Sequence, residues 1–185
     1  MYPVRIEGER IVLREFEERD LDASMAVVGD PDVTISLSFD TRTREEQAER
    51  LTADIARGQS EPRPDYYLAI ADRQTDELIG FIRIGLGGHR SGELGYALRR
   101  SHWRQGYTHE AAQLMLAHGF GELGLHRIQA ACGPDNLASQ AILRRLNFEY
   151  EGRMRDHVFT NGAWRDSLLY SVLADETPYP SRAST

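Results

Sequence analysis

The stretch Trp103-Arg104-Gln105-Gly106-Tyr107-Thr108-His109-Glu110-Ala111 decides which fold this chain is expected to adopt. It follows a strand-like run and opens a helix-like one, with a glycine at the centre of the turn. Such a turn presents unpaired backbone N–H groups at the positive end of the helix dipole, an arrangement that suits a pyrophosphate. A second segment, Pro134-Asp135-Asn136-Leu137-Ala138-Ser139, lies a short helix and a strand further on and also places polar groups at a helix start. Two helix starts behind two successive strands predict a ligand cleft.

Length and composition predict one soluble domain. With 185 residues, 41% of them hydrophobic, and no apolar run near the length of a membrane span, the chain can bury one sizeable core. We expect this domain to cover residues 1–177 and residues 178–185 to form a disordered tail. The N-terminus lacks the pattern of a signal peptide, which predicts a cytoplasmic protein without a membrane partner. The single cysteine, Cys132, cannot form an internal disulfide, and no histidine pair has metal-binding spacing, so no metal is expected.

The charged residues exclude several classes of function. All 22 basic residues are arginine and none is lysine, although a codon bias towards arginine is the simpler explanation. A Schiff-base lysine, a P-loop lysine and autoacetylation of a lysine side chain are therefore excluded. The net charge of −7 argues against a nucleic-acid partner and favours cationic or amine-bearing ones.

The hydrophobic pattern predicts a strand, two helices, a three-stranded antiparallel meander, a helix, a strand, a helix and a closing hairpin. Gly85 to Gly92 holds four glycines, which predicts a mobile turn. The step from 93–98 through the helix at 108–123 to 127–132 should be a parallel crossover, giving a mixed α/β sheet with helices on both faces. The expected strands are 10–14, 66–71, 78–84, 93–98, 127–132, 148–159 and 163–173, and the expected helices are 18–30, from Thr41 or Thr43 to 58, 108–123 and 136–146.

This order and both motifs resemble the GCN5-related N-acetyltransferase (GNAT) superfamily, and within it the Rim-type branch of ribosomal-protein N-terminal acetyltransferases. The resemblance covers residues 8–176. Glu93-Leu94-Gly95-Tyr96 is similar to the strand before the phosphate loop, residues 103–108 lie at the pyrophosphate loop, and Asn136 with Ser139 matches an Asn-x-x-Ser pattern. Further matches in the closing hairpin are Asp156, Trp164 and Asp166. The departures are Thr108, where glycine or alanine is commoner, and Asn147-Phe148 in place of Gly-Phe.

The resemblance implies a GNAT-like fold, mostly antiparallel, in which the two central parallel strands splay apart around acetyl-CoA. Backbone groups of Ala97, Leu98 and Arg99 would pair with the pantetheine amides, and Asn136 would fix the other side of that arm. The pyrophosphate would be held, without a metal, by backbone N–H groups of Arg104, Gln105, Gly106, Tyr107, Thr108 and His109.

The chemistry of a thioester suggests roles for two side chains. An amine attacks only when neutral, and we expect Glu93 to take its proton, directly or through water; a solvated carboxylate at a strand start is the alternative. The resemblance suggests that Ser139 protonates the departing thiolate, against a role as a small helix residue bonded to the backbone. The backbone N–H near Leu98 would stabilise the oxyanion. A glutamate and a tyrosine used elsewhere in the superfamily correspond to Ala131 and Leu143, which disfavours that version of the mechanism.

The predicted function is acetyl-CoA-dependent transfer of an acetyl group to a primary amine, with the α-amine of a peptide or protein as the acceptor that the branch implies. Two alternatives stay open. One is an acetyltransferase of a small amine such as an amino acid, a polyamine or an aminoglycoside. The other is a catalytically inactive domain that binds acetyl-CoA as a sensor or interaction module. The resemblance also implies a homodimer.

Overall fold

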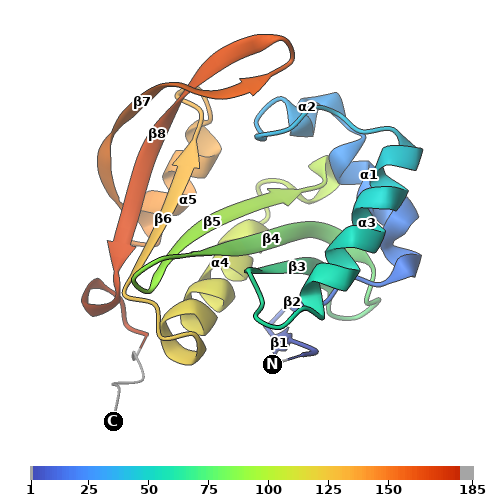
Figure 1. The fold of residues 1–185 in the computed structure, drawn as a ribbon, viewed down its shortest axis with the longest axis horizontal. Coiled ribbons are helices and arrows are strands. Elements are labelled where there is room, and N and C mark those ends of the chain that lie inside the picture. The colour runs from blue at the N-terminus through green and yellow to red at the C-terminus, as the bar shows by residue number, and fades with distance from the viewer. Residues whose placement is uncertain (1, 180–185) are drawn as a thin grey trace.

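One eight-stranded sheet forms the centre of the molecule (Figure 1). The structure is a computed structural model that describes residues 2–179, so residues 180–185 of the expected tail lie outside the described residues. The strand order is β1-β2-β3-β4-β5-β6-β8-β7, and only β5 and β6 run parallel. This confirms the predicted mixed sheet. The strands are Arg5–Glu7 (β1), Ile11–Arg14 (β2), Asp65–Asp72 (β3), Leu78–Gly87 (β4), Ser91–Leu98 (β5), Arg127–Cys132 (β6), Glu149–Thr160 (β7) and Ala163–Leu173 (β8).

Helices cover both faces of the sheet. Figure 1 shows α4 and α5 behind the sheet and α1 and α3 in front of it. Side chains alternate between the two faces along each strand, so Leu68 and Ile82 belong to the core with α4, whereas Ala69 and Phe81 belong to the core with α1 and α3. No helix among the described residues is both long and apolar enough to cross a membrane. The helices are Leu21–Val28 (α1), Pro31–Thr34 (α2), Arg44–Gly58 (α3), Tyr107–Ala117 (α4) and Leu137–Arg145 (α5), and a π-helical turn over His118–Glu122 continues α4.

Local sequence signals fix several element ends. Thr43 caps α3 in a capping box with Glu46, which decides between the two expected helix starts. Asn147 follows α5 with a φ of +63°, as expected for a helix end. Asn161 and Gly162 both have positive φ between β7 and β8, which confirms the predicted hairpin turn.

The turn expected over residues 85–92 is present but shorter, at residues 88–90. Strand β4 continues to Gly87 and β5 begins at Ser91, with Gly85 opposite Glu93. Glycines offer no side chains from which a strand could be recognised, but pairing with the neighbouring strands holds them extended. The three-residue β1 and the four-residue α2 were also not predicted, because both are too short to show a period.

Candidate active site between β5 and β6

Strands β5 and β6 separate after a short parallel contact. They pair at Ser91–Arg127, Gly92–Ile128 and Glu93–Gln129, and no pairing follows among the described residues. Each strand keeps its outer neighbour to the end, because β5 pairs with β4 through Leu98 and β6 pairs with β8 through Cys132. The result is a V-shaped gap with two inner strand edges. This confirms that the central parallel pair is splayed.

Along β5, the backbone N–H and carbonyl groups of every second residue point towards this gap. The N–H of Arg99 donates to the carbonyl of Ile79 at 2.9 Å, so it is bonded within the sheet and is not free for a pantetheine amide. In an antiparallel pair the bonding direction alternates, so the backbone groups of Ala97 also face β4, and those of Leu98 face the gap. The Leu98 carbonyl already accepts from Trp103 Nε1 at 2.6 Å. Of the three predicted backbone partners, the N–H of Leu98 is the one that fits.

The turn after β5 leaves a row of N–H groups free. Gly106 caps α4 with a φ of +85°, and the first helical bond runs from the Glu110 N–H to the Gly106 carbonyl at 3.1 Å. Within residues 2–179, no group accepts a hydrogen bond from the backbone N–H of any of residues 104–109. Residues 99–106 connect the end of β5 to the start of α4, so this row lies at the open end of the gap. Free donors at a helix N-terminus are suited to an anion.

Arg10 braces this turn from the other side of the chain. Its Nε donates to Glu110 Oε2 at 3.0 Å and its Nη1 donates to the Gln105 carbonyl at 2.8 Å. The same guanidinium lies 4.6 Å from the centre of the Tyr107 ring. These contacts fix the turn without using the N–H groups described above. Arg10 is separated from the turn by about ninety-five residues, so nothing in the motif points to it.

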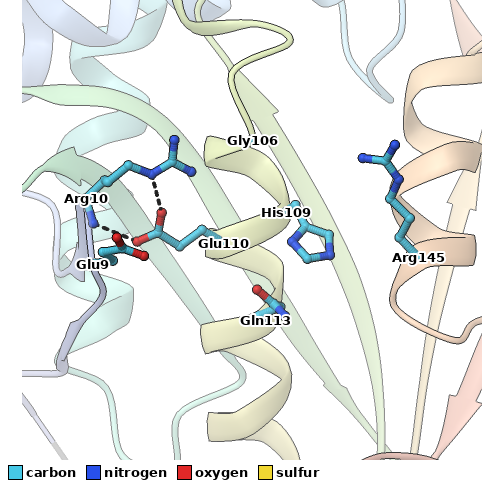
Figure 2. A pocket seen from close by; sticks show the side chains of 7 residues that line it. All are labelled: Glu9, Arg10, Gly106, His109, Glu110, Gln113 and Arg145. Atoms are coloured by element: carbon cyan, nitrogen blue, oxygen red, sulfur yellow. Dashed lines mark hydrogen bonds and ion pairs between the residues drawn. The ribbon is translucent and has the colours of Figure 1, made fainter.

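A cavity of about 320 Å³ adjoins the start of α4 (Figure 2). Figure 2 shows Arg145 reaching from α5 across the space towards His109 on α4, while Arg10 and Glu110 pair on the opposite wall. No hydrogen bond or ion pair holds Arg145 within the described residues. The cavity therefore combines a free guanidinium with a helix N-terminus. Its lining residues are Glu9, Arg10, Gly106, His109, Glu110, Gln113 and Arg145.

The start of α5 carries a hydrogen-bonded pair across the gap. Asn136 caps the helix by accepting the Ser139 N–H at 3.0 Å, and Ser139 Oγ lies 2.8 Å from the Tyr96 hydroxyl on β5. Burial raises the pKa of Tyr96, so its phenol is neutral at physiological pH. Cys132 is buried beside them at the end of β6; burial also raises the pKa of its thiol, opposed by a hydrogen bond with Ser139. The pair can supply a proton within the gap.

Glu93 lies on the opposite face from Tyr96 and Ser139. It occupies the last position at which β5 pairs with β6, and side chains alternate between faces along the strand. Glu93 therefore lies on the face of the sheet against which α1 and α3 pack, and it is exposed there. No hydrogen bond or ion pair of its side chain is found among the described residues. The structure therefore does not bring Glu93 and Ser139 together on one face. A reagent that occupies the gap could contact both.

The sequence motifs did not point to three of these residues as functional. Tyr96 stands in the sequence analysis only as part of the strand before the phosphate loop, and the motifs include neither Arg10 nor Arg145. Side chains alternate between the two faces along β5, and this alternation places Tyr96 towards α5. The predicted strand and helix together therefore carry the signal for a contact between Tyr96 and α5. Arg145 stands in the last turn of α5, three positions before Phe148, and only the packing of α5 beside α4 brings it to the cavity.

Known proteins are similar to this chain in sequence and architecture. The sequence profile of the acetyltransferase (GNAT) domain matches residues 10–149. YoaA of Bacillus subtilis (strain 168), an uncharacterized N-acetyltransferase, is 33% identical over 94% of this chain and 98% of its own length. The ribosomal protein uS5-alanine N-acetyltransferase of Escherichia coli (strain K12) is 31% identical over 61% of this chain and 60% of its own.

A solved structure agrees with the sequence matches. Mycobacterium smegmatis RimJ, in complex with CoA-disulfide, superposes with a TM-score of 0.83 and 27% identity over 96% of this chain and 90% of RimJ. The splayed strands, the free turn before α4 and these relatives lead to one conclusion: the chain belongs to the GNAT acetyltransferase family and is an N-acetyltransferase.

Proposed function

We propose that this enzyme transfers an acetyl group from acetyl-CoA to a primary amine, and that the acceptor is the α-amine of a peptide or protein. One observation carries the proposal: the free N–H groups of residues 104–109 stand at the open end of the gap between β5 and β6. This arrangement holds a diphosphate at one end of a slot and leaves room for an extended arm within it.

The residues at the site fit CoA from end to end. The N–H groups of the turn receive the pyrophosphate without a metal. Arg145 supplies a free positive charge to the nucleotide end in the cavity beside His109. The N–H of Leu98 bonds the pantetheine arm or the thioester oxygen. RimJ of M. smegmatis, which shares this fold at 27% identity, has been solved with CoA-disulfide, and this supports the assignment.

The chemistry divides between the two faces of the sheet. Acetyl-CoA supplies an activated acyl carbon, and its phosphate end enters from the side of α4 and α5. The neutral phenol of Tyr96 and the hydroxyl of Ser139 hold a proton for the leaving thiolate. Glu93, exposed on the other face, accepts the proton of the incoming amine directly or through water. The acceptor therefore approaches from the face of α1 and α3.

The resemblance to a protein that acetylates alanine of ribosomal protein uS5 supports a peptide or protein N-terminus as the acceptor. A cytoplasmic location and a homodimer belong to the same proposal. The absence of a metal requirement also stays a prediction, and a chelator that leaves turnover unchanged would agree with it.

The test combines binding and turnover. Acetyl-CoA is expected to raise the melting temperature, and a peptide panel with different N-terminal residues is expected to release thiol and gain one acetyl group by mass spectrometry. Turnover confined to free amino acids, polyamines or aminoglycosides would replace the peptide acceptor with a small amine. Clear binding of acetyl-CoA with no turnover on any amine would instead identify an acetyl-CoA sensor.

A further inference from the structure

On the face of the sheet opposite the proposed phosphate site, strands β3, β4 and β5 form an open surface beside the gap, called the floor below. The registers of β3, β4 and β5 place Tyr67, Arg83 and Gly95 side by side on this face. The neighbouring rank is Asp65, Gly85 and Glu93. Both ranks face α1 and α3, as Glu93 does, and they lie next to the point where β5 leaves β6.

The space above Gly95 is free. A Cβ built on Gly95 would meet no heavy atom within 4 Å, and the residue is exposed. In Figure 1, β4 and β5 lie between α3 on one side and β6 with β8 on the other. A small molecule or a chain end can therefore reach β5 here, next to Glu93.

Arg83 is held in place at the edge of this floor by a buried carboxylate. Its Nε donates to Asp65 Oδ2 at 2.7 Å, and the Asp65 side chain is 3% exposed. Asp65 also pairs with Arg57 at 3.4 Å, so two guanidinium groups share one carboxylate. The two guanidinium groups and the one carboxylate together carry a net charge of +1.

The guanidinium of Arg83 lies over Gly85, next to Glu93 on the neighbouring strand. A Cβ at Gly85 would lie 3.0 Å from Arg83 Nη2 and 3.1 Å from its Cζ, so the guanidinium covers Gly85, which is paired with Glu93. The Arg83 side chain is 44% exposed, and neither Nη1 nor Nη2 bonds to another described residue. An arginine fixed through Nε offers its remaining N–H groups in a defined direction, and these groups match a carboxylate.

We propose that Arg83 is an acceptor-binding residue that receives a carboxylate located within about one residue of the reactive amine. The amine is directed to Glu93 and the carboxylate to Arg83, so the floor complements a molecule with both charges. Two sources supply this chemistry: a free amino acid through its own α-carboxylate, or a peptide with an acidic side chain next to its N-terminus. This inference rests on the proposed function and names the acceptor class of the same site.

The experiment measures binding to the enzyme saturated with CoA, by calorimetry, so that it does not depend on turnover. Two matched pairs are compared: a peptide beginning Ala-Asp with one beginning Ala-Asn, and alanine with alaninamide. In the unaltered enzyme the carboxylate member of one pair is expected to bind about tenfold to hundredfold more tightly, as for other hydrogen bonds to charged groups. The pair that shows the preference identifies the source.

The variants separate recognition from structure. Arg83→Gln should reduce that ratio to about one, while Arg57 still pairs with Asp65 and keeps the melting temperature close to that of the unaltered enzyme. Arg57→Gln is the matched control, because it removes the other partner of Asp65 but leaves Arg83 in place, and it should preserve the ratio. The inference is overturned if neither pair shows a preference, if Arg83→Gln leaves the ratio unchanged, or if both variants lower it equally. A carboxylate preference in an enzyme that acetylates nothing would overturn the proposed function alone.

Discussion

The proposed cofactor half and the proposed acceptor half of this molecule, called the cofactor half and the acceptor half below, are built by different means. The cofactor half consists mainly of backbone groups: the inner edge of β5, the free N–H groups of residues 104–109 and the capped start of α5. In the acceptor half, side chains from different elements meet, as Asp65 of β3 and Arg83 of β4 do. Backbone sites leave short, recognisable motifs, whereas sites of assembled side chains do not.

The far wall of the acceptor half joins elements that lie far apart in the chain. At the tip of the β7–β8 hairpin, the N–H of Asn161 donates to Asp40 Oδ1 at 2.7 Å. The Arg165 guanidinium donates to the carbonyls of Ile35 and Leu37. Figure 1 shows this tip next to α2. The loop after α2 is thus fixed by a hairpin about 120 residues later in the chain.

The largest expected effect breaks the backbone site. Gly106→Val places a β-branched side chain at a φ of +85° and beside the free N–H groups. Loss of two or more charge-assisted hydrogen bonds should weaken CoA binding by about 10³-fold, measured by calorimetry. Gly88→Val is the control, because a Cβ there meets nothing within 4 Å. A folded Gly106→Val protein that keeps its CoA affinity would refute the assignment of the turn.

The next effect concerns the proton donor in the gap. Ser139→Ala and Tyr96→Phe should each lower kcat by about 10²-fold, the low end for acid–base catalysis, because a thiolate leaves readily. The double variant should be scarcely worse than either single one, because the two hydroxyls bond each other. Since burial raises the pKa of Tyr96, deprotonation of this phenol should not reduce kcat below about pH 10. Additive losses in the double variant would show that the pair does not act as a unit.

A smaller effect separates two neighbouring arginines of α5. Arg145→Gln removes the free charge at the cavity and should weaken CoA by about tenfold, with the loss fading at high salt. Arg144→Gln is the matched control, because that side chain extends towards Gln140 and Tyr170 instead. Equal losses in both variants would mean that general charge, and not the cavity, attracts the cofactor.

The smallest effect loosens the wall of the acceptor half. Arg165→Met removes the bonds to the loop after α2, so the loop must be ordered when the acceptor binds. The KM for the acceptor should rise about fivefold while the KM for acetyl-CoA stays the same. Steady-state kinetics with each substrate varied in turn gives both values. A rise in the acetyl-CoA KM would contradict the division into two halves.

The same division explains what the sequence could predict. Residues 127–132 and 163–173 were predicted as strands with the observed bounds, and the polar groups of residues 134–139 were expected at a helix start, because hydrophobic period and helix-start signals are local. The predicted turn between β4 and β5 is too wide, because strand pairing and not side-chain pattern keeps Gly85, Gly87 and Gly92 extended. Arg10 reaches the turn before α4, and Arg83 reaches its proposed acceptor site, only through strand register and packing. Neither the strand register nor the packing of helices leaves a short pattern in a single sequence.

Hydrogen exchange of the backbone amides of residues 104–109 tests the central claim most directly. Without ligand these amides have no acceptor among the described residues and should exchange rapidly. With saturating CoA they should become protected, together with Leu98, while the amides at the tip of the β7–β8 hairpin keep their rates. Unchanged exchange at residues 104–109 in a sample that demonstrably binds CoA would contradict the account.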